Sequence, residues 1–279
     1  MKDDHRNTPE FILQPFSLNV SHVRNNIPNI DIDFTDECRF ETYYEYFFDV
    51  PERSCETIIT LPEKYIPLLM EILRIGHITR RVPKTYTEEI NAIVNELPPF
   101  PSSKSQEKGW FVRSDTASLK YGKHGNKPYT NWLEIIESIV TCRNTHHPIT
   151  TPFRLYFLPY VRIINEFRVF IYESTIVGIS VSNIYCVSET ILFKKRRGLL
   201  DAYLTSLVSF VETVLERKPA CIRHTAMDIA ELDDYTFYFV EMNKYDRSGS
   251  AGFDWNTDTF LCVPRERDTP IPFRYVTDE

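Results

Sequence analysis

The sequence predicts an α+β fold in which helices pack on antiparallel sheets. Apolar residues recur with the two-residue period of strands in some segments and with the longer period of helices in others. Over the second half of the chain, strand pairs alternate with single helices. This order argues against a doubly wound parallel sheet, in which strands and helices alternate one by one. With 279 residues, the chain is long enough for one large domain or two small ones.

Composition and charge limit the classes of protein to be considered. Hydrophobic residues make up 42% and charged residues 25%, which is ordinary for a soluble globular protein. The formal net charge of −7 argues against general nucleic-acid binding, which favours basic surfaces. The six cysteines form no Cys-x-x-Cys pair, and the sequence shows neither an apolar signal core nor a membrane-spanning apolar run. We therefore expect a cytoplasmic protein with reduced thiols and no membrane partner.

A Pro- and Ser-rich stretch at 98–109, PPFPSSKSQEKG, is the candidate boundary between two regions. We expect an N-terminal α+β subdomain at 1–100 and a second region at 101–279. In the first region, we expect strands at 31–34 (DIDF) and 42–50 (TYYEYFFDV) and helices at 62–75 and 86–97.

The second region continues the alternation of strands and helices. Strands are expected at 109–115, 153–161, 165–187 (two strands around a turn near 173–175), 221–232 and 236–243, and helices at 130–140 and 199–218. Pro159 interrupts its strand, which must therefore lie at an edge or end there. The basic run Lys194–Arg197 is interpreted as a solvated helix start, and a phosphate contact is the alternative.

A carboxylate and an amide, Glu241 and Asn243, lie two residues apart at the end of an apolar strand. They point to one face, because side chains alternate between the faces of a strand. If Asp233-Asp234 is a two-residue turn, Asp228 lies opposite Phe239 and diagonal to Glu241, on that same face. If the turn were one residue longer or shorter, Asp228 would lie on the other face. The residues expected to precede Glu241 on the shared face are Phe237 and Phe239.

This arrangement is typical of a magnesium site. Two carboxylates and an amide oxygen are hard donors, which Mg²⁺ prefers, and without a cation the two carboxylates would be costly on an apolar face. We therefore predict a metal site formed by Asp228, Glu241 and Asn243. The alternative is an ordinary solvated strand end. Zinc is not expected, because no spacing of Cys and His fits it.

Basic residues that could bind phosphate occur at two places in the second region. Arg113 lies where a strand becomes a loop, and Lys120 follows seven residues later; Arg168 lies within a strand. Arginine suits bidentate phosphate contact, and lysine acts as a point charge, although a surface salt bridge is the alternative for each. The usual glycine-rich phosphate motifs are absent from the sequence. Any nucleotide must therefore be held mainly by side chains.

Taken in order, these segments resemble an ATP-grasp domain, and most closely the cell division cycle protein 123 family. That family has a basic residue, a Ser-rich loop and a second basic residue, like VRSDTASLK at 112–120. It has a Glu-Phe-Arg strand and then a Gly-Ile-Ser strand, like NEFRVFIYESTIVGIS at 165–180. It ends with an acidic strand, an acidic-x-Asn strand and a Trp, like AMDIAEL, FVEMN and FDW here. The resemblance covers roughly residues 85–256.

The resemblance implies an ATP-grasp fold, with antiparallel sheets and packed helices sandwiching a nucleotide, and places the nucleotide-binding region at 101–279. It also implies ATP and Mg²⁺ as cofactors. The phosphate-binding groups implied are Arg113, Lys120 and Arg168, with Arg168 also catalytic, and the implied Mg²⁺ ligands are Asp228, Glu241 and Asn243. The hinge whose backbone would hold adenine is Phe157–Val161, with Phe157, Leu158, Tyr160 and Val161 as the binding residues.

The departures from the family pattern favour one of two functions. Val181-Ser182 stands where the family has Gln-Arg, Glu241 where it has Asp, and Lys244 where it has Pro. Glu-x-Asn is the more common arrangement in ATP-grasp ligases, which join a small-molecule or peptide carboxylate to an amine through an acyl phosphate. We therefore expect such a ligase. The alternatives are an ATP-binding assembly chaperone for translation initiation factor 2, with the gamma subunit as partner, and a scaffold that binds no nucleotide.

Overall fold

The computed structural model describes residues 8–17, 40, 57–102, 109–143, 148–217, 222–245, 249–266 and 268–278. The chain forms two compact units. Unit 1 comprises residues 1–38 and 162–279, and unit 2 comprises residues 39–161. In sequence, unit 2 is therefore inserted into unit 1. The strands predicted at 31–34 and 42–50 lie outside the described residues.

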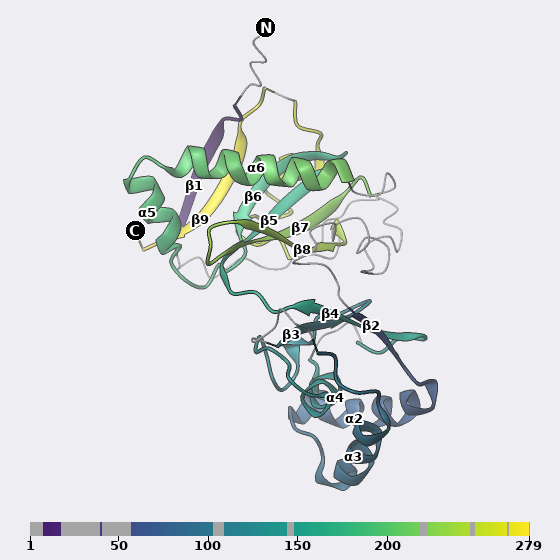
Figure 1. Cartoon of the computed structure of the whole chain (residues 1–279). Helices are drawn as coiled ribbons and strands as arrows, with labels where there is room; N and C mark the ends of the chain where they lie inside the picture. The colour runs from purple at the N-terminus through teal and green to yellow at the C-terminus, as the bar shows by residue number, and fades with distance from the viewer. Residues whose placement is uncertain are drawn as a thin grey trace, which may run out of the picture. The chain divides into compact units, whose positions relative to one another are not determined.

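Unit 1 is built on a six-stranded mixed sheet with the strand order β1-β9-β6-β5-β7-β8 (Figure 1). Strands β1 and β6 both run parallel to β9, and the remaining neighbours are antiparallel. The strands are β1 (Phe11–Ser17), β5 (Ile163–Tyr172), β6 (Thr175–Val181), β7 (Thr225–Leu232), β8 (Phe237–Asn243) and β9 (Ile271–Thr277). The first and last strands among the described residues thus lie side by side.

Helices α5 (Glu189–Arg196) and α6 (Leu200–Arg217) follow β6, and α6 crosses one face of the sheet (Figure 1). Its buried residues recur at helical spacing: Leu200, Leu204, Leu207, Val208, Val211 and Val214. The ring of Tyr203 on α6 lies 6.0 Å from that of Phe167 and 5.4 Å from that of Phe237. The opposite face of the sheet packs against a different segment, because Phe170 contacts Phe253 and Trp255.

In its described residues, unit 2 combines a three-stranded antiparallel sheet, in the order β2-β4-β3, with helices α2, α3 and α4. Its elements are β2 (Thr57–Leu61), α2 (Ile66–Thr79), α3 (Thr87–Glu96), β3 (Trp110–Ser114), α4 (Trp132–Thr141) and β4 (Phe153–Pro159). Helix α4 begins with a side-chain cap, because Asn131 accepts a hydrogen bond from the Glu134 amide at 3.0 Å. The Glu134 carboxylate in turn accepts a bond from the Thr130 amide at 2.8 Å.

The core of unit 2 joins residues from both sides of the predicted boundary near residue 100. Leu97 and Trp110 belong to one buried hydrophobic cluster. The indole of Trp110 donates to the carbonyl of Pro101 at 3.0 Å, and that of Trp132 donates to the carbonyl of Pro98 at 2.7 Å. The chain therefore divides between its two units after residues 38 and 161, and residue 100 lies within unit 2.

Four predicted helices occur in the structure, as α2, α3, α4 and α6. The sequence prediction missed β1, β2, β9 and α5. The interpretation of the basic run Lys194–Arg197 as the start of a helix is wrong, because α5 begins at Glu189 and the run lies at its C-terminal end. Cations are favourable there, since the carbonyl end of a helix is negative. None of the helices described has the length and apolar character required to cross a membrane.

Candidate functional site

Three neighbouring strands of unit 1 carry the predicted metal ligands and the predicted catalytic arginine. In the register of the sheet, Arg168 of β5 pairs with Asp228 of β7, and Asp228 pairs with Glu241 of β8. Directly opposite residues present their side chains on the same face. Arg168, Asp228 and Glu241 share the sheet face that carries Phe170, whereas α6 packs on the opposite face. The structure thus brings Arg168, Asp228 and Glu241 together in one row.

The turn that produces this row differs from the predicted two-residue turn. The Leu232 amide donates to the carbonyl of Thr236 at 2.9 Å, so the loop has three residues, 233–235. This loop shifts the register by one residue, and a β-bulge beside Asp228 shifts it by one more. Asp228 consequently lies opposite Glu241, and the prediction that it faces Phe239 is wrong.

The same bulge reverses the predicted face of the two phenylalanines. Phe237 and Phe239 pair with Glu231 and Ile229, whose side chains point to the α6 side. The Phe237 ring accordingly contacts Tyr203 of α6. The prediction that both phenylalanines share a face with Glu241 is therefore wrong.

Arg168 and Asp228 form a bidentate ion pair inside unit 1. Arg168 Nε donates to Oδ1 of Asp228 and Nη2 donates to Oδ2, each at 2.8 Å. The side chains of Arg168 and Asp228 are only 17% and 2% exposed. Burial opposes the charge on Arg168, but the Asp228 carboxylate and its hydrogen bonds, with a contribution from Glu241, raise the guanidinium pKa above its ordinary value. Arg168 therefore stays charged and fixes the orientation of Asp228.

Asn243 completes the set of oxygen-bearing groups. Its Nδ2 donates to Asp228 Oδ2 at 3.0 Å, which leaves the amide oxygen as an acceptor for another group. Asp228 Oδ1 accepts only the Arg168 Nε bond among the described residues, so it retains an acceptor site. Glu241 is half-buried beside them. The oxygens of Asp228, Glu241 and Asn243 are hard donors, which fit a magnesium ion. Among the described residues, no group of three His, Cys, Asp or Glu side chains is placed to bind a metal.

The polar row extends across the whole sheet, which the sequence did not reveal. Ser180 of β6 pairs with Arg168, Arg274 of β9 pairs with Ser180, and Gln14 of β1 pairs with Arg274. Arg274 forms a second bidentate pair, donating from Nη1 and Nη2 to the Asp258 carboxylate at 2.7 Å each. Two bidentate Arg–Asp pairs therefore lie on one face of the sheet of unit 1.

Both arginines hold the glycine-containing loop that follows β8. Arg168 Nη1 donates to the carbonyl of Gly249, and Arg274 Nη1 donates to that of Gly252, each at 2.9 Å. The Gly252 amide donates to Ser180 Oγ at 2.9 Å, and an added Cβ on Gly252 would lie 2.6 Å from that oxygen. The sequence signal for this loop is the small-residue run at 249–252, GSAG, which begins six residues after Asn243.

The other two predicted phosphate-binding residues, Arg113 and Lys120, belong to unit 2 and flank a tight loop. Arg113 pairs with Ser118 across this loop, and the Ser114 amide donates to the carbonyl of Ala117 at 2.8 Å. Arg113 is 5% exposed, and its guanidinium lies 4.2 Å from the ring centre of Phe40. Lys120 is half-buried, with Nζ 5.4 Å from the ring centre of Tyr121.

The predicted hinge, Phe157–Val161, is the end of β4 and the last segment of unit 2. The Phe157 ring is fully buried, and it contacts Trp110 and Trp132 edge to face at 5.8 and 5.6 Å. Leu158 is buried as well, while Tyr160 and Val161 are half-buried beyond the strand. The Phe157 side chain therefore builds the core, and a role of this segment's backbone in binding adenine stays a prediction. Strand β4 ends at Pro159, as its proline predicts, although it is the central strand of its sheet.

The helices and sheets of the two units make an α+β protein, which confirms the predicted fold class. No protein-family model matches the sequence, and no curated protein sequence matches it. The likeness is to solved structures.

One such structure is Cdc123 from Schizosaccharomyces pombe, with 14% identity, a TM-score of 0.54, and coverage of 85% of this chain and 95% of that one. The C-terminally truncated form of the same protein gives 14% identity and a TM-score of 0.55, with coverage of 86% and 95%. A RiPP-associated ATP-grasp ligase from Chryseobacterium gregarium is 13% identical, with coverage of 83% and 69%, but its TM-score of 0.28 is too low to support an argument. The chain therefore has the fold of Cdc123, as the sequence resemblance predicted.

Proposed function

We propose that this protein binds ATP with Mg²⁺ and joins a carboxylate to an amine. The observation that carries the proposal is the row Arg168, Asp228 and Glu241 on one face of unit 1, with Asn243 bonded to Asp228. Two carboxylates beside an amide and a permanently charged guanidinium match the needs of a metal-bound triphosphate. The Glu-x-Asn spacing at 241–243 favours a ligase over the chaperone pattern.

In this proposal, Asp228, Glu241 and Asn243 hold the magnesium ion, which would offset charge on the phosphates. Arg168 has two tasks: it orients Asp228 through the bidentate pair and stabilises negative charge that develops during phosphoryl transfer. Arg113 and Lys120 would contact phosphate, and the backbone at 157–161 would bind adenine. These assignments rest on the sequence resemblance and on the fold that the chain shares with Cdc123.

The proposed reaction has two steps and needs no nucleophile from the protein. A carboxylate oxygen of the substrate attacks the γ-phosphorus of ATP, which forms an acyl phosphate and releases ADP. The amine nitrogen then attacks the acyl carbon, inorganic phosphate leaves, and the nitrogen loses a proton as the amide forms. Arg168 would act in the first step, in which the charge moves to the transferring phosphoryl group.

Calorimetry with Mg-ATP tests the binding site. We expect the full-length protein to bind Mg-ATP and Glu241→Ala to bind it at least about tenfold more weakly, because a ligand that carries charge is lost. Glu216→Ala, which removes an exposed carboxylate from α6, is the matched control and should bind as tightly as the unmodified protein. Equal affinity of the Glu241→Ala variant would overturn the metal assignment.

A second candidate function is an assembly chaperone for translation initiation factor 2. It is favoured by the likeness to Cdc123, which extends over 95% of that chain. ADP release that depends on an added carboxylate and amine would support the ligase. ATP binding without turnover, together with capture of the purified gamma subunit of the factor, would support the chaperone.

A further inference from the structure

Strand β1 forms one edge of the six-stranded sheet of unit 1. Among the described residues it pairs with β9 alone. Its sequence, FILQPFS, is mostly apolar, yet none of its seven residues is buried against the described part of the chain. Six of the seven residues of β9, by contrast, are buried. An apolar edge strand of this kind is a surface on which another extended chain can pair.

The register with β9 shows which backbone groups of β1 point outward. Phe11 lies opposite Ile271, and the Ile271 amide donates to the carbonyl of Glu10 at 2.8 Å. Alternate residues of a strand direct their N–H and C=O groups to opposite sides, so the even-numbered residues of β1 bond to β9. The N–H and C=O groups of Phe11 and Leu13 therefore point away from the sheet.

Pro15 occupies the next outward position. Its missing N–H costs no ladder hydrogen bond there, and it ends the row of outward donors. A pairing partner would therefore match the first half of β1, around Leu13. Donors and acceptors in line along a sheet edge are matched by the backbone of an extended peptide.

A pocket of about 370 Å³ borders this edge, a volume within the range of small-molecule sites. Ile12 and Gln14 of β1 line it, so it lies on the sheet face of the polar row. Ile12 is 46% exposed, and Val263, which also lines the pocket, is 55% exposed. Three prolines and a phenylalanine add to the apolar lining, and the two charged residues in it, Arg265 and Glu266, have opposite signs. The pocket therefore suits a large apolar side chain.

Hydrogen bonds fix one wall of the pocket before any ligand binds. Arg265 Nε donates to the carbonyl of Ile176 at 2.7 Å, and Nη1 donates to the carbonyls of Glu266, at 3.2 Å, and Thr269. These bonds attach the segment that precedes β9 to the beginning of β6. A pre-formed site loses less entropy on binding than one that must be ordered.

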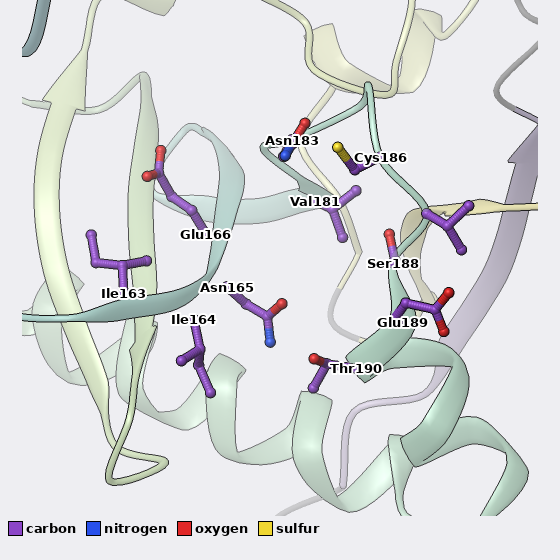
Figure 2. Close-up of a pocket in the computed structure, with 11 residues that line it drawn as sticks. Ile163, Ile164, Asn165, Glu166, Val181, Asn183, Cys186, Ser188, Glu189 and Thr190 are labelled. Atoms are coloured by element: carbon purple, nitrogen blue, oxygen red, sulfur yellow. The ribbon is translucent and has the colours of Figure 1, made fainter. Parts of the chain in front are cut away.

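The open edge distinguishes this pocket from another one in unit 1, where the beginning of β5 meets the end of β6 (Figure 2). Both of these strands have a neighbour on each side, so neither offers an edge. The Glu166 and Glu189 carboxylates in that lining point away from each other (Figure 2), so their charges do not converge on one ligand group.

We propose that β1 binds an extended peptide segment of another protein, which adds a strand to the sheet and places one large apolar side chain in the pocket beside Ile12. A residue of the added strand that lies opposite Ile12 or Gln14 faces the pocket, because directly opposite residues share a face. This binding requires neither ATP nor the proposed metal site.

Fluorescence anisotropy with short labelled peptides tests the binding. The probes are KTFTK, KTLTK and the matched KTSTK, each with an N-terminal fluorescein and a C-terminal amide. We expect KTFTK or KTLTK to bind the full-length protein saturably, and KTSTK to bind at least about tenfold more weakly, because it lacks the apolar side chain. Absence of saturable binding by both apolar peptides, or equal binding of KTSTK, would overturn the proposal.

Methylation of the peptide backbone distinguishes strand pairing from capture of a side chain alone. In a paired strand every second amide points to its neighbour. N-methylation of the central residue and N-methylation of the following threonine should therefore differ: one should weaken binding at least about tenfold, and the other should leave it nearly unchanged. Equal effects of the two changes would overturn strand addition.

Two protein variants test the edge and the pocket separately. Leu13→Pro removes an outward N–H and no hydrogen bond to β9, and Val263→Ser changes an exposed lining residue, so both should fold, as circular dichroism can verify. Each should weaken binding of the tighter peptide at least about fivefold. Ile78→Ser, at a 71% exposed position of α2 in unit 2, is the control and should bind the peptide as before. Unchanged binding in both Leu13→Pro and Val263→Ser would contradict the assignment.

The other occupant to be tested is β1 of a second copy of this chain. Sedimentation equilibrium should show a monomer, and a dimer that Leu13→Pro converts to a monomer would overturn the peptide assignment in favour of self-association. The peptides are added without nucleotide, so this proposal and the ligase proposal fail separately. Loss of Mg-ATP binding would remove the ligase and leave the peptide site, and absence of peptide binding would do the reverse.

Discussion

Arg168 carries a positive charge into the interior of unit 1 together with its counter-ion. Its guanidinium bonds both carboxylate oxygens of Asp228, and its third nitrogen bonds the carbonyl of Gly249. A buried ion pair contributes little net stability when it is complete, but removal of one partner leaves an uncompensated buried charge. The pair is therefore expected to matter more for the geometry of the site than for the stability of the fold.

The Asp228→Asn variant measures the cost of leaving the buried Arg168 charge without its partner. We expect it to lower the free energy of unfolding by about 3 kcal/mol, because the Arg168 charge stays buried without its partner. In the double variant Arg168→Met/Asp228→Asn the charge is gone, so the loss should be smaller than in Asp228→Asn alone. Urea unfolding followed by circular dichroism gives both values. A loss in the double variant that equals or exceeds the loss in Asp228→Asn would show that the two charges do not compensate each other.

The sequence correctly predicted that Asp228, Glu241 and Asn243 lie close together, but it did not predict their register. Their role as metal ligands stays a prediction. Alternation along a strand correctly placed Glu241 and Asn243 together, because it depends only on local backbone structure. The partner of Asp228 depended on two irregularities, a three-residue loop and a bulge, whose one-residue shifts add up to two and so leave Asp228 on the predicted face. Neither has an unambiguous local signal. The pairing with Arg274 and Asp258 joins distant segments, so no local pattern could reveal it.

At the scale of elements, the structure shows which helices and strands can be predicted from the sequence. Helices α2, α3, α4 and α6 have apolar residues at helical spacing and were predicted. Strands β1 and β9 contain Pro15 and Pro272, and a proline argues against a strand unless it lies where no ladder hydrogen bond is required. Strand β1 is an edge strand, and the β6–β9 register involves only Phe273 and Arg274 of β9. Both prolines are therefore tolerated, for reasons that only the tertiary structure supplies.

The β7–β8 hairpin contains a residue in an unfavourable backbone conformation. Tyr235 has a φ of 63° and is 71% exposed. Asn tolerates this left-handed region better than Tyr, so Tyr235→Asn should raise the free energy of unfolding by about 0.5–1 kcal/mol. Urea unfolding is again the measurement. Tyr185→Asn, at a position that is 84% exposed and not among the residues of positive φ, should leave stability unchanged. A similar gain from both changes would argue against relief of backbone strain at Tyr235.

At the scale of the whole molecule, unit 2 is inserted in sequence between the two segments of unit 1. Unit 2 has its own hydrophobic core, in which residues of α2, α3 and α4 pack against residues of its sheet. A boundary at residue 100 would divide this core, because Leu61, Ile72 and Ile90 lie before it and Trp132 and Phe157 lie after it. Composition suggested a linker at 98–109, but the indole hydrogen bonds to Pro98 and Pro101 attach residues 98–101 to the core.

The insertion can be tested with fragments. Residues 39–161 should fold alone and show a cooperative thermal transition in the fluorescence of Trp110 and Trp132, because their core is complete. The fragment 101–161 lacks β2, α2 and α3, and should show no such transition. A fragment 39–161 that melts without cooperativity would mean that unit 2 depends on the rest of the chain.

The pairing of β1 with β9 has a consequence for the order of events on the ribosome. Synthesis proceeds from the N-terminus at about 5–20 residues per second, so residues 11–17 emerge long before their partner strand at 271–277 exists. All of unit 2 is translated in the interval. During this time, the backbone N–H and C=O groups of residues 11–17 cannot form their hydrogen bonds to β9, although unit 2 can already fold. Completion of the larger sheet must therefore follow the synthesis of unit 2 and of strands β5 to β8.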